Sequence, residues 1–399
     1  MASPIGIVGA GIGGLTLACT LEQSNIPFQL YEQSESFEAL GYGIQVSPNV
    51  VRILSALGLA EELEKMAHRC HGFELRSFYS DQTLIQWQLP KNQLYYQCRR
   101  ADLHQLLFDG LQDKSKLNFS THLSSYARAS DSISLQFDCA TDANVSALVG
   151  ADGVGSQTRK QLMLDSQNTK PSYAGYAAFR AILPWRSPYA ELAGKATVWL
   201  GKNHHVVAYP NGNLTSEHGQ QWLNLVLVVK EKQWQEEGWA IAANKQEVAA
   251  EFSNQSKLLN QILVDMIDSP EPCYKWGLFE RSPLPFWSQG RVTLLGDAAH
   301  PMLPFQAQGA AMSIEDAYIL AQCLQRHSEI ETAFRQYEKM RYHRATQMQK
   351  TSRKNADIFH ASGLKAIARD FVFRVADLVA PDLMNLKSAW IYDYDATRL

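Results

Sequence analysis

The chain has 399 residues, a length that suits two or three domains, and its formal net charge of −3 excludes the strongly basic character typical of nucleic-acid-binding proteins. Its six cysteines include no C-x-x-C pair, so neither a metal site nor a disulfide framework is predicted. No apolar stretch is long and uncharged enough for a membrane span, and the glycine-broken N-terminal run lacks the basic start of a signal peptide. We therefore expect a cytoplasmic protein that binds neither nucleic acid nor membrane.

Strand and helix signals alternate from the N-terminus. Residues 4–8 predict a strand, residues 12–24 a helix and residues 27–31 a second strand. A β-α-β unit of this kind is typical of a parallel sheet with helices on its faces. We therefore expect an α/β domain to begin here.

The turn after the first strand has the pattern G-x-G-x-x-G, formed by Gly9, Gly11 and Gly14. The first glycine allows the tight turn, the second lets the backbone approach a pyrophosphate, and the third allows close packing of helix on strand. Glu32 ends the second strand, at the position where an acidic side chain binds ribose hydroxyls. The motif predicts dinucleotide binding but does not by itself distinguish NAD from FAD.

Alternating apolar and polar residues become frequent in residues 72–95 and again in residues 172–285. This pattern is typical of antiparallel strands, and its clearest runs are residues 196–200, 205–209 and 222–229. Residues 210–213 are turn formers. After Gly309 helical periodicity returns and continues to about residue 380. The order predicts a nucleotide domain interrupted by an inserted sheet domain.

Two further motifs follow apolar strands. Residues 147–159 contain D-G-x-x-S-x-x-R, which begins at Asp152, and residues 290–301 end in G-D-A-A-H-P, which includes Asp297. A carboxylate at the end of a strand can accept hydrogen bonds from sugar-like hydroxyls. The helix that starts near Gly309 would direct its backbone N–H groups and the positive end of its dipole at a ligand.

Together these motifs resemble those of the single-component FAD-dependent aromatic hydroxylases, the p-hydroxybenzoate hydroxylase superfamily. Residues 41–49, the R-x-x-L pattern at residues 100–103 and the C-terminal W-I-Y-D-Y-D at residues 390–395 extend the likeness over nearly the whole chain. The C-terminal pattern is similar to that of the branch containing salicylate hydroxylase, 3-hydroxybenzoate 6-hydroxylase and 6-hydroxynicotinate 3-monooxygenase.

The resemblance implies an α/β fold with a glutathione-reductase-type FAD-binding domain, an inserted antiparallel-sheet substrate domain and C-terminal helices. The FAD-binding domain would comprise residues 1–71, 96–171 and 286–360. The substrate domain would comprise residues 72–95 and 172–285, and the C-terminal helical segment residues 361–399.

FAD would be held by the three glycines and Glu32 together with Gln45, Arg100, Asp152, Asp297, Gly309 and Ala310. Because no second nucleotide-binding pattern is present, NADH or NADPH would dock only transiently, and the sequence does not distinguish between them. By resemblance, the reduced FAD reacts with O2 to give a C4a-hydroperoxide, which hydroxylates a phenolic or N-heteroaromatic small molecule, expected to be carboxylated. The protein would act as a monomer or a homodimer.

His205 and Tyr209 are the candidate catalytic residues. Side chains four apart on a strand share one face, and an imidazole can accept or relay the proton that a phenol loses before electrophilic attack on its ring. The pattern H-x-x-x-Y-P also matches a pair of residues in this branch. A purely structural pair on the strand is the alternative, and His204, expected on the other face, is the control.

The pocket candidates lie in two segments. Pro304 and Phe305 would form a wall, and residues 303–305 offer no polar side chain for substrate. Arg180 would pair with a substrate carboxylate, with a surface ion pair as the alternative. His300 is expected to pack in its loop and not to act as a base. Two other functions stay open: a flavin oxidase or hydroxylase of a non-aromatic polycyclic compound, and a non-catalytic flavin redox sensor.

Overall fold

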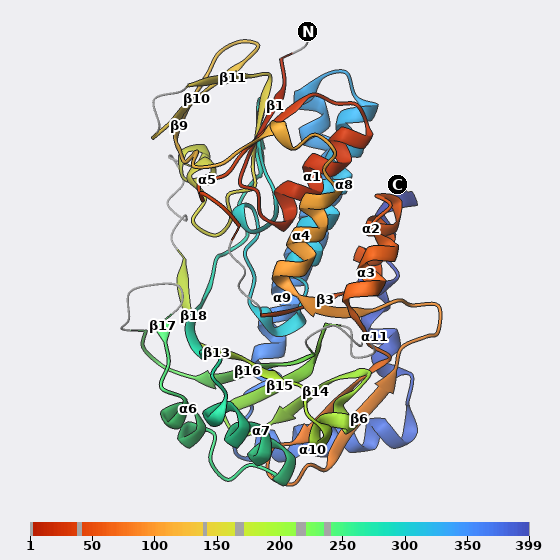
Figure 1. The fold of residues 1–399 in the computed structure, drawn as a ribbon. Helices are drawn as coiled ribbons and strands as arrows, with labels where there is room; N and C mark the ends of the chain where they lie inside the picture. Colours follow the sequence, from red (N-terminus) through yellow and green to blue (C-terminus); the bar gives the residue numbers. More distant parts are fainter. Residues whose placement is uncertain are drawn as a thin grey trace.

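Two sheets of different character lie toward opposite ends of an elongated molecule (Figure 1). The computed structural model describes residues 3–37, 42–138, 142–163, 171–212, 221–234 and 241–398. Gly41 of the segment 41–49, Cys139 and Asn213 lie outside these residues. Within the described ranges, no helix is long and apolar enough to cross a membrane.

The first sheet has six strands and begins with β1 (Ile5–Val8), as predicted. β1 is central and pairs in parallel with β2 (Phe28–Tyr31) and β12 (Ala147–Gly150). The other members are β8 (Leu117–Asn118) beside β2, β20 (Val292–Leu294) beside β12, and the antiparallel edge strand β19 (Ser288–Gln289). Because β1, β12 and β20 are parallel, the three motifs that follow them meet at one edge of the sheet.

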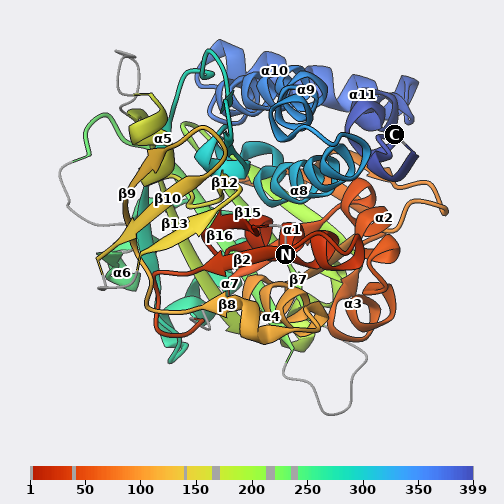
Figure 2. The same cartoon turned by 90° about the horizontal axis from the view of Figure 1, so that it is seen from above.

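Helices pack beside this sheet in the order α8, α1, α4 (Figures 1 and 2). Their bounds are α1 (Ile12–Gln23), α4 (Arg100–Gly110) and α8 (Gly309–Arg326). Ten of the twelve residues of α1 are buried, because it lies between α8 and α4. The remaining helices of this part are α2 (Pro48–Ala56), α3 (Ala60–Met66) and α5 (Gln157–Leu162).

Two small three-stranded sheets complete this part of the molecule. One contains β9 (Leu123–Arg128), β10 (Ile133–Phe137) and β11 (Ala143–Val145). The other contains β3 (Gly43–Val46), β4 (His68–Arg69) and β7 (Tyr96–Arg99). The second of these sheets adjoins the larger sheet through contacts between β7 and β15.

The larger sheet has eight strands in the order β17-β18-β13-β16-β15-β14-β5-β6. Their bounds are β5 (Gly72–Ser77), β6 (Thr83–Gln88), β13 (Ser172–Pro184), β14 (Lys195–Leu200), β15 (His204–Asn211), β16 (Trp222–Lys230), β17 (Ile241–Ala242) and β18 (Tyr274–Glu280). The sheet is antiparallel except at one place, where β14 and β5 pair in parallel. Pro210 and Asn211, which were expected in a turn at residues 210–213, still pair with β16.

Helices cover one face of the eight-stranded sheet. α6 (Lys245–Glu251) and α7 (Lys257–Asp268) were not expected from the alternating pattern of this segment. The apolar side of α7 packs against inward-facing strand residues such as Val206 and Leu225. The opposite face of the sheet lines a cavity.

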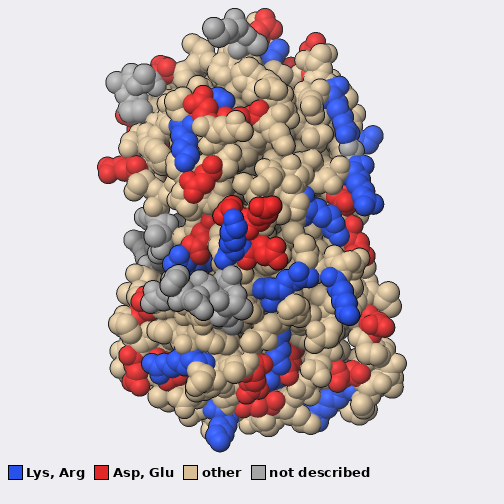
Figure 3. All heavy atoms as spheres, turned by 45° about the vertical axis from the view of Figure 1, so that its right-hand side comes forward, with Lys and Arg blue, Asp and Glu red and all other residues tan. Residues whose placement is uncertain are grey.

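The C-terminal part is helical, as expected. α9 (Ile330–Phe359) is 30 residues long, packs on α8 and ends beside β15, where the residue after it contacts His205. α10 (Leu364–Val379) and α11 (Leu383–Tyr392) complete this part. On the face drawn in Figure 3, acidic and basic side chains are interspersed, in keeping with the small net charge of the chain.

Candidate active site

A cavity of about 1010 Å³ extends from the carboxyl edge of the six-stranded sheet to the open face of the eight-stranded sheet. This volume lies at the upper end of the range of ligand pockets. Its wall at one end is formed by the glycine turn after β1 and by the N-terminus of α8, and at the other by strands β13 to β16. A single long ligand could therefore touch both sheets.

The glycine turn has one open position and two crowded ones. A Cβ added to Gly14 would lie 1.9 Å from the carbonyl oxygen of Gly9, so this glycine allows α1 to approach β1. Gly9 has φ of +101°, and a Cβ there would lie 2.4 Å from the carbonyl oxygen of Ala151. A Cβ on Gly11 would meet no atom of the described residues within 4 Å, and Gly11 lines the cavity. The geometry fits a ligand that lies against Gly11.

Glu32 lies beside this turn. Its carboxylate accepts hydrogen bonds from the backbone N–H of Ala10, at 2.8 Å, and of Ser34, at 3.0 Å. The two bonds fix the side chain next to the turn and leave lone pairs on the same oxygens for a further donor, such as a ribose hydroxyl.

Asp152 has a structural position that the sequence did not reveal. Its carboxylate accepts hydrogen bonds from the Ser156 hydroxyl and from the backbone N–H of Thr158 at the start of α5. The cavity is lined by its neighbours Ala151 and Gly153 instead. The hydrogen bonds of the Asp152 side chain thus hold the turn between β12 and α5.

Arg159, the last residue of the same motif, joins two of the loops at the sheet edge. Its guanidinium donates to the carbonyl oxygens of Ala298, at 2.9 Å, and of Val154. Burial, with help from nearby Arg281, lowers the pKa of Arg159 to about 10, so it stays charged near neutral pH. The D-G-x-x-S-x-x-R motif thus ties the loop after β12 to the loop that carries Asp297.

Asp297 and the start of α8 lie together on the cavity wall. Burial raises the pKa of Asp297, while His300, Arg100 and Arg159 act in the opposite direction. Gly309 and Ala310 form the first turn of α8 and line the cavity, so unpaired backbone N–H groups of an 18-residue helix lie at its wall. Arg100, at the start of α4, lines the same cavity.

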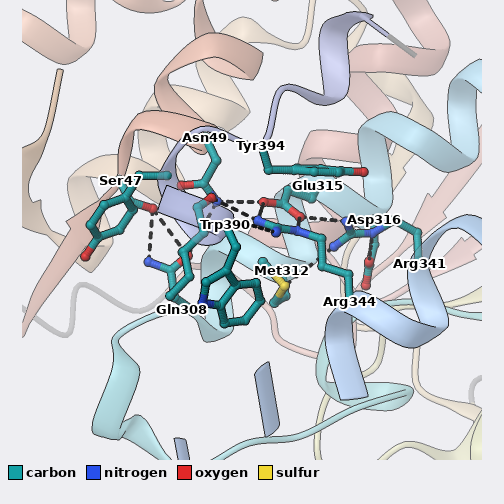
Figure 4. A network of polar contacts seen from close by, with 12 residues as sticks. Ser47, Asn49, Gln308, Met312, Glu315, Asp316, Arg341, Arg344, Trp390 and Tyr394 are labelled. Atoms are coloured by element: carbon teal, nitrogen blue, oxygen red, sulfur yellow. Dashed lines mark hydrogen bonds and ion pairs between the residues drawn. The ribbon is translucent and has the colours of Figure 1, made fainter. Parts of the chain in front are cut away.

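A buried polar network holds α8 in place (Figure 4). Glu315 accepts from Asn49 at 2.6 Å and from Arg344, and it forms an ion pair with Arg341 at 2.6 Å. Asp316 pairs with Arg341 at 2.7 Å and with His300 at 2.5 Å. The network explains why His300 packs in its loop. It also ties α8 to α2 and α9 through Glu315 and Asp316, two residues of α8 that the sequence did not single out.

Gln45 lies between the two sheets. Its side-chain oxygen accepts a hydrogen bond of 2.6 Å from the Tyr95 hydroxyl, and both residues line the cavity. Gln45 also acts on Tyr209 of β15, whose pKa it lowers slightly against the larger effect of burial. Its position therefore connects the expected flavin side of the cavity to the candidate catalytic strand.

Alternate residues of β15 face the cavity. His205, Val207 and Tyr209 line it, whereas His204 packs against Phe78 and Phe252 on the helix-covered side of the sheet. The alternation follows from the pleat of the strand. Burial raises the pKa of Tyr209, so its phenol remains protonated at neutral pH and can donate a hydrogen bond.

His205 has a neighbour that the strand pattern could not reveal. Its Nδ1 lies 3.1 Å from Nε2 of His360, the residue directly after α9. Burial, followed by the influence of His360, His204 and Arg369, lowers the pKa of His205 well below its ordinary value. Burial also lowers the pKa of His360 to about 4, so both rings are neutral near pH 7.

The other pocket candidates also reach the cavity. Pro304 and Phe305 line it, and Phe305 packs edge-on against Tyr176 with ring centroids 5.5 Å apart. Arg180 donates to the carbonyl oxygen of Gly43 at 3.3 Å and lies over the ring of Tyr42. The C-terminal helices add further polar lining, which comprises Asn355 and four residues that the sequence did not single out: Thr351, Lys354, Lys387 and Ser388.

The combination of a dinucleotide-type glycine turn, a carboxylate and a helix N-terminus on one cavity fits the phosphates, sugar hydroxyls and ring edge of FAD. The open space at Gly11 is the observation that tests this fit. The fold and the site thus define a flavoprotein whose cofactor would extend toward a second sheet.

The chain belongs to the family described as FAD binding domain, whose model matches residues 2–352, and FAD is its cofactor. It is 33% identical over 402 residues to the 3-amino-4-hydroxybenzoate 2-monooxygenase PtmB3 of Streptomyces platensis, with 98% of this chain and 96% of that protein covered. It is also 33% identical to the 6-hydroxynicotinate 3-monooxygenase of Pseudomonas fluorescens, with 88% and 90% covered. The predicted membership in the FAD-dependent aromatic hydroxylases is confirmed.

A solved salicylate hydroxylase substrate complex has a similar fold, with a TM-score of 0.83 and 23% sequence identity over 100% of this chain and 97% of that chain. The likeness extends to both sheets, because it spans the entire chain.

Proposed function

We propose that the protein uses NADH or NADPH and O2 to hydroxylate a phenolic or N-heteroaromatic small molecule that carries a carboxylate. The observation that carries this proposal is the shared cavity, in which the FAD-side residues Gly11 and Asp297 and the strand residues His205 and Tyr209 line one continuous wall. The Streptomyces platensis and Pseudomonas fluorescens relatives are named for hydroxylated aromatic acids, which supports the substrate class.

The domain division expected from the sequence belongs to this proposal. All strands of the eight-stranded sheet fall within residues 72–95 and 172–285, and all strands of the six-stranded sheet fall outside them. This distribution supports a glutathione-reductase-type FAD-binding domain interrupted by a substrate domain. The active site would then lie at the domain interface, where ligand sites are common.

The candidate residues on the cavity wall would have separate roles in the proposed reaction. When bound, FAD supplies electron transfer from the nicotinamide and activation of O2. His205 accepts the phenolic proton of the substrate, which makes the ring more electron-rich, and Tyr209 orients the substrate by a hydrogen bond. Arg180 pairs with the carboxylate. The apolar side chains of Val207, Phe305 and their neighbours exclude water from the reacting atoms.

The test is a panel of hydroxybenzoates, aminohydroxybenzoates and hydroxynicotinates, scored for stimulation of NADH and of NADPH oxidation. Products formed under ¹⁸O2 are then analysed by mass spectrometry. Incorporation of one labelled oxygen supports the proposal. Oxidised product without label would indicate a flavin oxidase, and no stimulation by any aromatic acid would refute the substrate class.

Variants test the roles of the strand residues. His205→Ala and Tyr209→Phe are expected to reduce substrate-stimulated turnover, while His204→Ala, on the opposite face of β15, serves as the matched control. Unchanged turnover in both cavity variants would show that the pair is structural. That result would indicate that the catalytic residues lie elsewhere on the cavity wall.

A further inference from the structure

His360 and His205 form a pair of neighbouring rings, and the backbone carbonyl of Ala356 determines which ring nitrogen of His360 carries the hydrogen. Nδ1 of His360 lies 2.8 Å from the backbone carbonyl oxygen of Ala356, one turn earlier in α9. A carbonyl oxygen can only accept a hydrogen bond, so Nδ1 of His360 carries the hydrogen. In a neutral ring, Nε2 of His360 is then an acceptor.

The second ring is fixed by the first. Nδ1 of His205 lies 3.1 Å from Nε2 of His360, and an acceptor nitrogen requires a donor opposite it. Nδ1 of His205 therefore carries the hydrogen of that ring. Its Nε2, on the opposite side of the imidazole, keeps a lone pair, and the ring lines the cavity.

The surroundings keep both rings neutral. The charged and titratable groups that influence the pair are Lys230 on β16, Arg369 on α10 and Tyr176 on β13, together with His204, which acts from the other face of β15. Arg369 is held by the carbonyl oxygens of Ile358 and Phe359 at the end of α9 and by Asp370. The nearby cations and the burial of the pair both disfavour an added proton, and a proton on each facing nitrogen would remove the hydrogen bond between the rings.

We propose that His360 is a positioning residue that fixes His205 as the Nδ1–H tautomer, so that Nε2 of His205 is the proton acceptor presented to the cavity. The tautomer itself follows from the contacts in the protein. Its use in catalysis rests on the proposed function.

The resulting proton transfer balances without a further reactant. The phenolic O–H bond of the substrate breaks and an N–H bond forms at Nε2 of His205, which yields a phenolate and an imidazolium. Because burial and the nearby cations disfavour an imidazolium, it exists only as an ion pair with the phenolate formed in the same step, and its Nδ1 still donates to His360. The proton leaves to solvent when the product departs.

The direct test is ¹⁵N NMR of the histidine side chains in the FAD-loaded protein. The His205 signals are assigned by their loss in His205→Asn. We expect a protonated Nδ1 and an unprotonated Nε2 in the wild type, and a shift toward the Nε2–H tautomer in His360→Phe, which has no acceptor. An Nε2–H tautomer in the wild type, or an unchanged tautomer in His360→Phe, would overturn the proposal whether or not a substrate is known.

Kinetics then test the catalytic consequence with an aromatic acid that the wild type hydroxylates. His360→Phe is expected to lower kcat/KM about tenfold, as for the loss of one orienting hydrogen bond, and to weaken the phenolate absorbance of the bound ligand. His360→Gln, whose amide oxygen can accept from Nδ1 of His205, should restore most of both.

The controls separate positioning from general damage. His204→Gln, on the other face of the strand, should leave kcat/KM and the phenolate absorbance unchanged, and melting temperatures identify variants that do not fold. If His360→Phe does not fold, His360→Met provides a second variant without a strong acceptor. Equal losses in His360→Gln and His360→Phe, with normal melting temperatures, would refute the role. If the wild type hydroxylates no aromatic acid, the proposed function fails while the NMR result still decides the tautomer.

Discussion

Gly11 and Gly14 should respond in opposite ways to the same substitution. In Gly14→Ala the new Cβ would lie 1.9 Å from the Gly9 carbonyl oxygen, a clash between two parts of the backbone that no side-chain rotation relieves. We expect it to lower the free energy of unfolding by about 3 kcal/mol, the upper end for overpacking. In Gly11→Ala the residue keeps φ of −69° and its Cβ meets no described atom within 4 Å. Its effect on the apoprotein should stay within about 1 kcal/mol.

The effect of Gly11→Ala should instead appear in cofactor binding. The added methyl group would occupy space on the cavity wall where the pyrophosphate is expected, so we expect the Kd for FAD to rise about tenfold or more. Urea unfolding of the apoproteins measures the first effect, and titration of flavin fluorescence measures the second. Unaltered FAD affinity in Gly11→Ala, or equal destabilisation of the two apoproteins, would refute this account of the turn.

Three further predictions concern buried ionisable side chains. Arg341→Met should lower the free energy of unfolding, measured in urea, by about 3–5 kcal/mol, because Glu315 and Asp316 each lose a positively charged partner. A change below about 1 kcal/mol would contradict a stabilising role of these ion pairs. Burial alone would raise the pKa of Asp316, but His300 and Arg341 outweigh it and lower that pKa. The stability that Asp316 contributes is therefore present above the pKa of the carboxyl group in the unfolded chain, and it is lost as the pH falls through the lowered pKa in the folded protein. Melting temperatures of the wild type should accordingly fall more steeply in acid than those of Asp316→Asn. Because the pKa of His205 is lowered, substrate-stimulated turnover should show no His205-dependent break near pH 6.5, and a break there that disappears in His205→Gln would contradict its neutral state.

Local patterns predicted the parts of this protein that local physics decides. The order of apolar runs gave β1, α1 and β2 within a residue or two, because strand and helix periodicities are properties of short segments. The shared face of His205 and Tyr209 followed from the pleat alone. The parallel pair of β5 and β14 did not follow, since Gly72 and Lys195 pair across a long stretch of intervening chain and no local pattern joins them.

The candidate site shows the same division. Glu315 and Asp316 in the middle of α8 have the sequence pattern of a solvated helix face, and their burial depends on Arg341 and Arg344 of another helix. Asp152 lies in a cofactor-type motif, but its hydrogen bonds to α5 could be seen only in the folded turn. His360 stands 155 residues from His205, and no spacing rule joins them.

The length of α9 determines the direction in which its residues point at the two ends of the cavity. Arg341 and Arg344 in its middle bind the carboxylates of α8, and Ser352 and Asn355 further along donate to the carbonyl oxygens of Leu303 and Phe305. His360 lies just past its last turn. Each residue added to an α-helix turns the residues beyond it by about 100° and advances them by about 1.5 Å. One residue inserted after Asn355 would therefore carry the imidazole of His360 away from β15. The ion pairs of Arg341 and Arg344 with α8 would remain in place. α9 therefore fixes both the distance and the rotation about its axis between the residues at the cofactor end of the cavity and the residue at its proton-accepting end.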